Sequence, residues 1–332
     1  MNTLDRKRFG KSSDLTTSKS RQVSLQGIER KFWINLESTD FLYKVDDENK
    51  LGFAELFYSH ICNKLGINCV NVYPAHDKKE DTKGVIVESF VSSKKTNLPL
   101  GAFLHDCMHQ HYMGIEGYYT YSDFTRILGK FQKREGFVLA KGFLADVRKM
   151  ILLDFLFGNE DRHLSNVEVY AEKNIFGKTR ISLAPLFDNG MSLGLRQLSR
   201  RYWTYDEFRY LSIPCFAFYE ADPQMKYAEP IEKFAFSYKK QLDSDPELFE
   251  LYQKIKSLDL RAELEYVSKV SGYNLSDYEL DYITKFVAYL FDVLEHIAEK
   301  DFSGGVVGEE QEEYFESYDD EDLEYQMYGF ER

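Results

Sequence analysis

The sequence predicts an α+β protein of two lobes, in which a small β-rich N-lobe precedes a larger helical C-lobe. The chain has 332 residues, 43% of them hydrophobic and 16% aromatic, which is enough material for two packed units. Strand-like runs dominate the first hundred residues, and helical periodicity dominates after Pro99. We therefore place the N-lobe at residues 24–98 and the C-lobe at residues 99–300.

The N-lobe pattern runs strand, strand, helix, strand, strand. Two runs rich in aromatic and β-branched residues, 31–36 and 41–45, flank a polar turn and predict a β-hairpin. A helical pattern follows over residues 53–65, because its apolar residues recur on one face. Residues 70–73 and 84–90 predict two further strands.

The C-lobe pattern is helical on both sides of one segment rich in motifs. Residues 121–132 and 139–157 have helical periodicity, and so does the long stretch 245–300. The apolar stripes of these helices predict core packing. The intervening segment, residues 158–193, breaks the periodicity and carries the polar residues discussed below.

The two ends of the chain carry opposite charge. Residues 1–31 contain eight basic and three acidic residues, whereas residues 301–332 contain twelve acidic residues and one arginine. Such runs are typical of solvated arms and tails. We expect a basic flexible arm at residues 1–23 and an acidic disordered tail at residues 301–332. Docking of the tail on the arm is an alternative to a plain solubilising tail.

Several classes of protein are excluded by composition. The four cysteines form no C-x-x-C pair, which argues against a zinc framework or a disulfide scaffold. The first thirty residues lack an apolar signal-peptide core, and no window approaches 18 consecutive apolar residues. We expect a cytoplasmic protein with no membrane span, with secretion as an effector left open.

The segment from Gly158 to Asn166 carries the strongest chemical signal. It follows a predicted helix, so Asp161 and Asn166 should lie on a loop, five residues apart. A phosphotransferase needs a carboxylate to accept the proton of the attacking hydroxyl, and a carboxamide oxygen to bind the metal on the triphosphate. Protein kinases place these groups on a catalytic loop with the same D-x-x-x-x-N spacing. The alternative is that both residues merely form turns.

A second motif, Leu186 to Gly190, lies shortly downstream. It follows a predicted strand, Ile181 to Leu183. An aspartate at such a strand end, followed within two residues by glycine, suits a metal-binding carboxylate on a turn. Asp188 therefore occupies the place of the kinase metal-binding aspartate, although Asn189 stands where the kinase motif has phenylalanine.

Together these motifs resemble the HipA-like serine/threonine kinase family, especially its short HipT-like and CtkA-like members. The resemblance rests on N-x-D-R-H-x-x-N followed by L-A-P-L-F-D-x-G. It implies a two-lobed protein-kinase-like fold that binds ATP and Mg²⁺. Asp161 would be the catalytic base, and Asn166 and Asp188 the metal ligands. The supporting residues of the loop would be Asn159, Arg162 and His163.

The nucleotide side of the site is predicted from the N-lobe. Lys44 stands in an apolar run, where a buried ammonium needs a partner, and Glu55 on the following helix is the candidate. By resemblance, Lys44 would contact the ATP phosphates; the alternative is an exposed strand lysine and a plain surface glutamate. The same resemblance implies the remaining nucleotide-binding candidates, which would be Glu88 and Phe90 near adenine, and Lys31 and Gly27 near the phosphates.

The predicted function is that of a Mg-ATP-dependent protein kinase with a serine or threonine acceptor. Autophosphorylation of the Ser-rich arm, a toxin- or effector-like role and an antitoxin-like regulator are further hypotheses. A lipid or small-molecule kinase on the same fold is the first alternative. The second is a non-catalytic module that binds a partner or nucleic acid. We do not expect direct nucleic-acid binding, because the acidic tail would oppose phosphate contacts.

Overall fold

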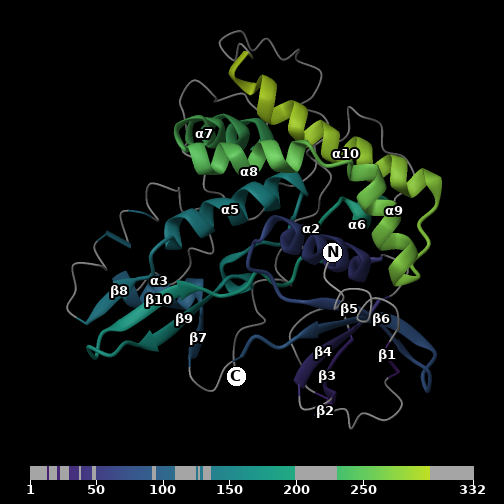
Figure 1. Ribbon diagram of the computed structural model, residues 1–332, viewed down its shortest axis with the longest axis horizontal. Helices are drawn as coiled ribbons and strands as arrows, with labels where there is room; N and C mark the ends of the chain where they lie inside the picture. The colour runs from purple at the N-terminus through teal and green to yellow at the C-terminus, as the bar shows by residue number, and fades with distance from the viewer. Residues whose placement is uncertain are drawn as a thin grey trace, which may run out of the picture.

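The computed structural model shows two β-sheets and a group of helices arranged as a small and a large lobe (Figure 1). Gly27, most of the predicted arm and the whole predicted tail lie outside the described residues. The structure describes residues 13–14, 21–22, 30–36, 39–46, 50–91, 95–108, 125, 128–129, 136–198 and 230–299.

The small lobe is built on a six-stranded sheet in the order β1-β5-β6-β4-β3-β2. Hydrophobic side chains cover both of its faces: Val85 and Val87 join the main core, whereas Tyr43 and Ile86 join a smaller cluster. The strands are β1 (Ser13–Asp14), β2 (Arg21–Gln22), β3 (Lys31–Leu36), β4 (Thr39–Val45), β5 (Val72–Asp77) and β6 (Thr82–Glu88).

Strands β4 and β6 approach each other closely beside Lys44. A Cβ at Gly84 would lie 2.0 Å from the carbonyl oxygen of Lys44, so only glycine fits there. The antiparallel register pairs Lys44 with Val85 on one side and with Lys31 on the other. Lys44 is thus fixed in the middle of the sheet.

Helix α2 (Leu51–Leu65) packs on this sheet and ends at Gly66, whose φ of +71° is the left-handed conformation typical of a glycine C-cap. The C-lobe also holds α2 from outside, through α9 (Leu260–Ser271) and the segment that follows it. Glu263 pairs with both His60 and Lys64 of α2, and Tyr273 donates a hydrogen bond to Asp46. Helix α2 is therefore enclosed by both lobes.

A second sheet, in the order β7-β9-β10-β8, extends from the large lobe (Figure 1). Strand β7 (Thr96–Pro99) pairs with β9 (Glu168–Lys173), which forms a hairpin with β10 (Thr179–Leu183). Strand β8 (Phe137–Leu139) runs parallel to β10 at the other edge. Sequence periodicity had not indicated β8.

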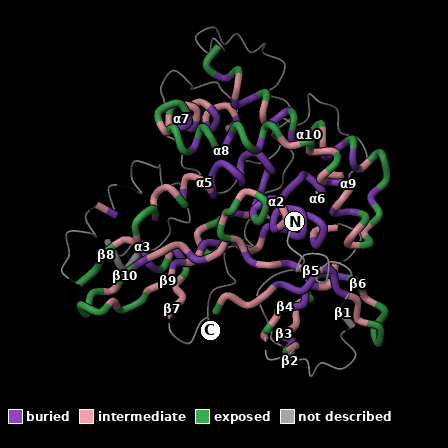
Figure 2. Tube along the Cα trace, viewed as in Figure 1, coloured by how far each residue is buried: buried purple, intermediate pink, exposed green. Residues whose placement is uncertain are grey.

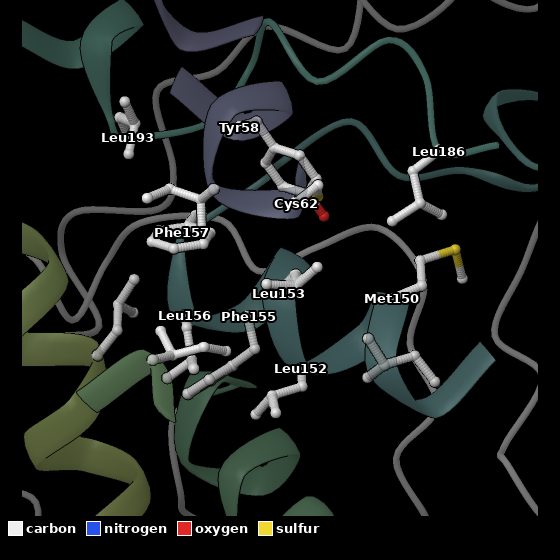
Figure 3. Packing of buried hydrophobic residues seen from close by; sticks show 14 of the residues in the cluster. Tyr58, Cys62, Met150, Leu152, Leu153, Phe155, Leu156, Phe157, Leu186 and Leu193 are labelled. Atoms are coloured by element: carbon white, nitrogen blue, oxygen red, sulfur yellow. The ribbon is translucent and has the colours of Figure 1, made fainter. Parts of the chain in front are cut away.

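Helix α5 (Phe143–Leu156) occupies the centre of the large lobe and contacts the core side of α2. It begins later than its apolar pattern suggested, because Gly142 adopts a φ of +86° immediately before it. Figure 3 shows Tyr58 and Cys62 of α2 against a run of apolar side chains that leads from α5 into the loop that follows it. This packed interface between α2 and α5 supports the loop that begins at Gly158.

The other helices cover α5 and α2, except for α3 (Leu100–Met108), which packs on strands β7 and β9; their buried stripes face inward and their exposed faces outward (Figure 2). Helix α7 was not predicted, and most of the predicted helix at residues 121–132 lies outside the described part. No helix among the described residues is long and apolar enough to cross a membrane. These helices are α3 (Leu100–Met108), α6 (Leu195–Leu198), α7 (Pro230–Ser244), α8 (Pro246–Lys256) and α10 (Asp277–His296), with a 3-10 turn, η5 (Ile297–Glu299).

Candidate active site

The loop that follows α5 brings Asp161 and Asn166 into contact. The carboxamide nitrogen of Asn166 donates to the backbone oxygen of Asp161 at 2.9 Å and to its Oδ2 at 3.1 Å. A single 3-10 turn, η2 (Leu164–Asn166), reverses the chain between them, and the ring Nδ1 of His163 caps it by accepting from the Ser165 amide. The local sequence thus folds so that the two predicted residues meet.

Lys44 joins this loop to the N-lobe. Its ammonium nitrogen bonds to Glu55 of α2 and lies 2.6 Å from Oδ1 of Asp188. Lys44 and Glu55 are buried, whereas Asp188 is part-exposed. Asp188 itself has a φ of +55°, a left-handed conformation that non-glycine residues seldom adopt and that is often found at functional sites.

The charges in this cluster stabilise one another. Burial alone would lower the pKa of Lys44, but the carboxylates of Glu55 and Asp188 outweigh it and raise the pKa above the ordinary value. Burial alone would raise the pKa of Asp188, but Lys44, and then Lys31, hold it well below its usual range. Lys44 is therefore cationic and Asp188 anionic at neutral pH.

Asp161 lies in a different electrostatic environment. Burial raises its pKa; His163 opposes that shift, and the negative charge of Asp188 adds to it. The Nε2 of His163 lies 3.7 Å from Oδ1 of Asp161. A carboxylate with a raised pKa is a better proton acceptor than an ordinary one, provided that it stays ionised.

Arg162 is completely buried and uses all five of its N–H groups, which makes it the centre of the loop's support. Nε and Nη2 donate to the two carboxylate oxygens of Asp154 at 2.8 and 3.1 Å. Nη1 donates to the backbone oxygens of Asn166 at 2.9 Å and Phe187 at 2.7 Å, and Nη2 also bonds to Oδ1 of Asn189. One guanidinium thus fixes both motif loops.

Asp154 connects the hydrogen bonds of Arg162 to both α5 and α2. This carboxylate of α5 is 1% exposed and also accepts from the Tyr58 hydroxyl of α2 at 2.8 Å and from the Asn159 carboxamide at 3.0 Å. Asp154, Tyr58 and Asn189 were not predicted as site residues. The available signal was an aspartate within the apolar helical run 150–158, since a buried carboxylate requires a cation or several donors.

The residues predicted to lie near adenine are placed at the end of β6. The Glu88 carboxylate accepts from Asn71 at 2.9 Å, so its side chain is already engaged within the N-lobe sheet. Phe90 packs against Phe187 in a tilted arrangement, with ring centroids 5.1 Å apart, and its backbone oxygen accepts from the Tyr170 hydroxyl at 2.7 Å. Phe187 directly precedes Asp188, so this aromatic group borders the charged cluster.

The oxygen groups of the cluster suit a hard divalent cation. No group of three or more His, Cys, Asp or Glu residues that could hold a metal occurs among the described residues. However, Asn166 uses only its nitrogen in the hydrogen bonds above, which leaves its carboxamide oxygen beside Asp161, and Asp161 is close enough to Asp188 for the charge of Asp188 to raise its pKa. Mg²⁺ in phosphotransferases takes one or two protein oxygens and completes its shell with phosphate and water, so the residues fit it.

The fold and this arrangement define a protein-kinase-like class. A strand lysine is paired with a helix glutamate, and a D-x-x-x-x-N loop faces a following aspartate, which is how protein kinases arrange these groups. The cluster lies where the two lobes meet.

A family model, the HipA-like C-terminal domain, matches residues 23–209, and the chain belongs to this family. The proinflammatory kinase CtkA of Helicobacter pylori is a similar solved structure, with 13% identity and a TM-score of 0.55 over 87% of this chain and 99% of CtkA. These comparisons establish the HipA-like kinase family and the fold, as the motifs indicated. No curated protein matches the chain.

Two more distant structures were also found. HipA of the Shewanella oneidensis MR-1 toxin-antitoxin system, solved with HipB and operator DNA, has 15% identity and a TM-score of 0.46 over 89% of this chain and 71% of that one. Choline kinase LicA of Streptococcus pneumoniae has 14% identity and a TM-score of 0.23 over 82% and 94%.

Proposed function

We propose that the chain is a Mg-ATP-dependent kinase that phosphorylates serine or threonine in a protein. The single observation that carries this proposal is the position of Lys44 between Glu55 and Asp188, with Asp161 and Asn166 alongside. A solvated strand lysine would not be 5% exposed and bonded to two carboxylates from distant segments. Phosphoryl transfer depends mainly on positioning and charge, and this cluster supplies both.

Each residue has a role that follows from its contacts. Lys44, oriented by Glu55, would contact the phosphates of ATP once a nucleotide enters between Lys44 and Asp188. Asn166 and Asp188 would hold Mg²⁺, which neutralises charge on the transferred phosphoryl group. Asp161 would orient the acceptor hydroxyl and take its proton, and the Asn166 hydrogen bond fixes the rotamer of Asp161 for this purpose.

The protein acceptor is the finer part of the proposal. It rests on the family, because acceptor specificity is expected in the loops near Asn189 to Tyr219, and residues 199–219 of these lie outside the described part. Autophosphorylation of the Ser-rich arm and binding of an antitoxin-like regulator are further predictions that rest on the family.

Transfer of labelled phosphate from Mg-ATP tests the proposal. The wild type is incubated alone and with a cytosolic extract, beside Asp161→Asn and Lys44→Met. We expect each substitution to lower labelling about a hundredfold or more, because the base or the phosphate contact is lost. Asp292→Asn, a carboxylate on the exposed side of α10, is the matched control and should leave labelling unchanged.

The products separate the acceptor classes. Acid-stable phosphoserine or phosphothreonine supports a protein kinase. Label that appears only in lipid or small-molecule fractions would replace the protein acceptor with the first alternative. Equal labelling by wild type and Asp161→Asn would refute the assigned base, and failure of the wild type to bind Mg-ATP would refute the whole site.

A further inference from the structure

The β9–β10 hairpin ends in two large apolar residues that lie almost wholly in solvent. Ile175 is 94% exposed and Phe176 is 81% exposed. Single exposed apolar residues are common on protein surfaces, but two adjacent ones at a projecting tip are not needed for folding. The hairpin forms an outer corner of the molecule (Figure 1).

The turn that carries these residues is held by hydrogen bonds rather than left loose. Oδ1 of Asn174 accepts from the amides of Phe176 at 2.9 Å and Lys178 at 3.0 Å. The backbone of Asn174 bonds to Lys178 and Gly177 as well, at 2.8 and 3.0 Å. The fold therefore presents the side chains of Ile175 and Phe176 outward on a defined turn.

Other exposed apolar residues gather at the same end of the sheet. Phe137 and Val138 of β8 are 38% and 37% exposed, and the parallel register places them beside Thr179 and Arg180, just below the tip. These four residues make up more than half of the seven large apolar residues exposed in the described part of the chain. Figure 2 shows this free end of the hairpin as exposed.

The charge at this end is opposite in sign to that of the whole chain. Lys173, Lys178 and Arg180 are exposed next to the tip, against one exposed acid, Glu172. The chain as a whole carries a net charge of −13. None of these three basic residues forms an ion pair with a carboxylate of the described residues, so their charge is available to an anionic partner.

We infer that the tip of the β9–β10 hairpin docks on an anionic lipid bilayer, with Ile175 and Phe176 inserted between headgroups and the basic residues against them. A bilayer surface suits a convex apolar tip with a cationic collar, because apolar burial and attraction to anionic lipid act together. Residues Lys173 to Lys178 do not contribute to the charged cluster around Lys44, so this inference does not depend on the proposed kinase activity.

Co-sedimentation of the full chain with vesicles tests the inference. Vesicles of phosphatidylcholine mixed with phosphatidylserine are compared with vesicles of phosphatidylcholine alone. We expect binding to the anionic vesicles that weakens as salt is added, because exposed charges are screened. Because the chain already contains two tryptophans, Phe176→Trp is compared with the wild type. Its additional emission should shift to the blue with the same vesicles, which reports insertion of the tip itself.

Paired variants separate the two contributions. Ile175→Ser with Phe176→Ser should lower partitioning about tenfold or more, because the inserted apolar area is lost. Lys173→Gln with Lys178→Gln should lower it roughly thirtyfold at low salt. Tyr278→Ser removes an aromatic residue that is 63% exposed at the start of α10 and should change nothing. All of these side chains are exposed, so thermal unfolding should not change either.

Three outcomes would overturn the inference. The wild type could fail to sediment with anionic vesicles. It could sediment equally well after the tip substitutions, which would assign binding to another surface. Light scattering could show concentration-dependent self-association that the Ile175→Ser and Phe176→Ser substitutions abolish in the absence of lipid, which would make the tip a contact between protein copies.

Discussion

Replacing Arg162 with lysine should damage both folding and catalysis, although the charge is kept. The arginine side chain is 0% exposed and donates five hydrogen bonds in a fixed planar arrangement. A lysine ammonium can donate at most three, and not in the same plane. At least two buried acceptors among Asp154, Asn166, Phe187 and Asn189 would then lose their donor.

The expected magnitude follows from that count. A hydrogen bond that involves a charged group contributes about 1.5–3 kcal/mol, so the loss of two predicts destabilisation by about 3–6 kcal/mol. Removing the charge as well, as in Arg162→Met, leaves the Asp154 carboxylate buried without its cation, which is itself worth roughly 3–5 kcal/mol. Urea unfolding followed by tryptophan fluorescence measures both values.

The control is the same substitution at an exposed arginine. Arg261 of α9 pairs with Glu265, Asp277 and Asp281, so Arg261→Lys also disturbs several ion pairs. Because these pairs lie in solvent, we expect no measurable change in stability. The contrast separates burial and geometry from the mere number of contacts.

A double substitution separates positioning from stability. Arg162→Met combined with Asp154→Leu removes the buried charges together, and stability should recover in part. Phosphotransfer should not recover, because the backbone oxygens of Asn166 and Phe187 still lack the group that fixes them. If Arg162→Lys unfolds at the wild-type urea concentration and keeps the wild-type kcat, the network has neither role and the reasoning is refuted.

Two further predictions concern pH and packing. Burial raises the pKa of Asp161, and His163 opposes that rise. His163→Gln should therefore move the acid limb of the kcat/KM profile to higher pH. An unchanged acid limb would show that His163 does not influence the pKa of the catalytic base. Gly158 has a φ of +58° and an added Cβ would lie 2.4 Å from Phe286, so Gly158→Ala should destabilise by about 2–4 kcal/mol in thermal or urea unfolding. Gly272→Ala has a similar φ, of +79°, with nothing within 4 Å, so it should cost only about 1 kcal/mol; equal effects would contradict the packing argument.

Local patterns in the sequence determined several secondary-structure elements of this protein and the spacing of its site residues. The hairpin at residues 31–45, helix α2 with its Gly66 cap and the short spacing from Asp161 to Asn166 all depend on neighbouring residues, so periodicity and turn chemistry indicated them. Residue type also predicted the Lys44–Glu55 pair, because an ammonium in an apolar strand needs a carboxylate within reach.

Only the tertiary structure decided how distant segments meet. Lys44 and Asp188 are 144 residues apart, and Tyr58 and Asp154 are 96 apart, and no local pattern fixes such pairs. The same holds for β8, which is too short to show a period and is specified by pairing with β10, and for the pairing of Glu263 with α2. Short-range forces set the elements and the motif loops, whereas packing between distant elements brought together the charged residues that complete the site.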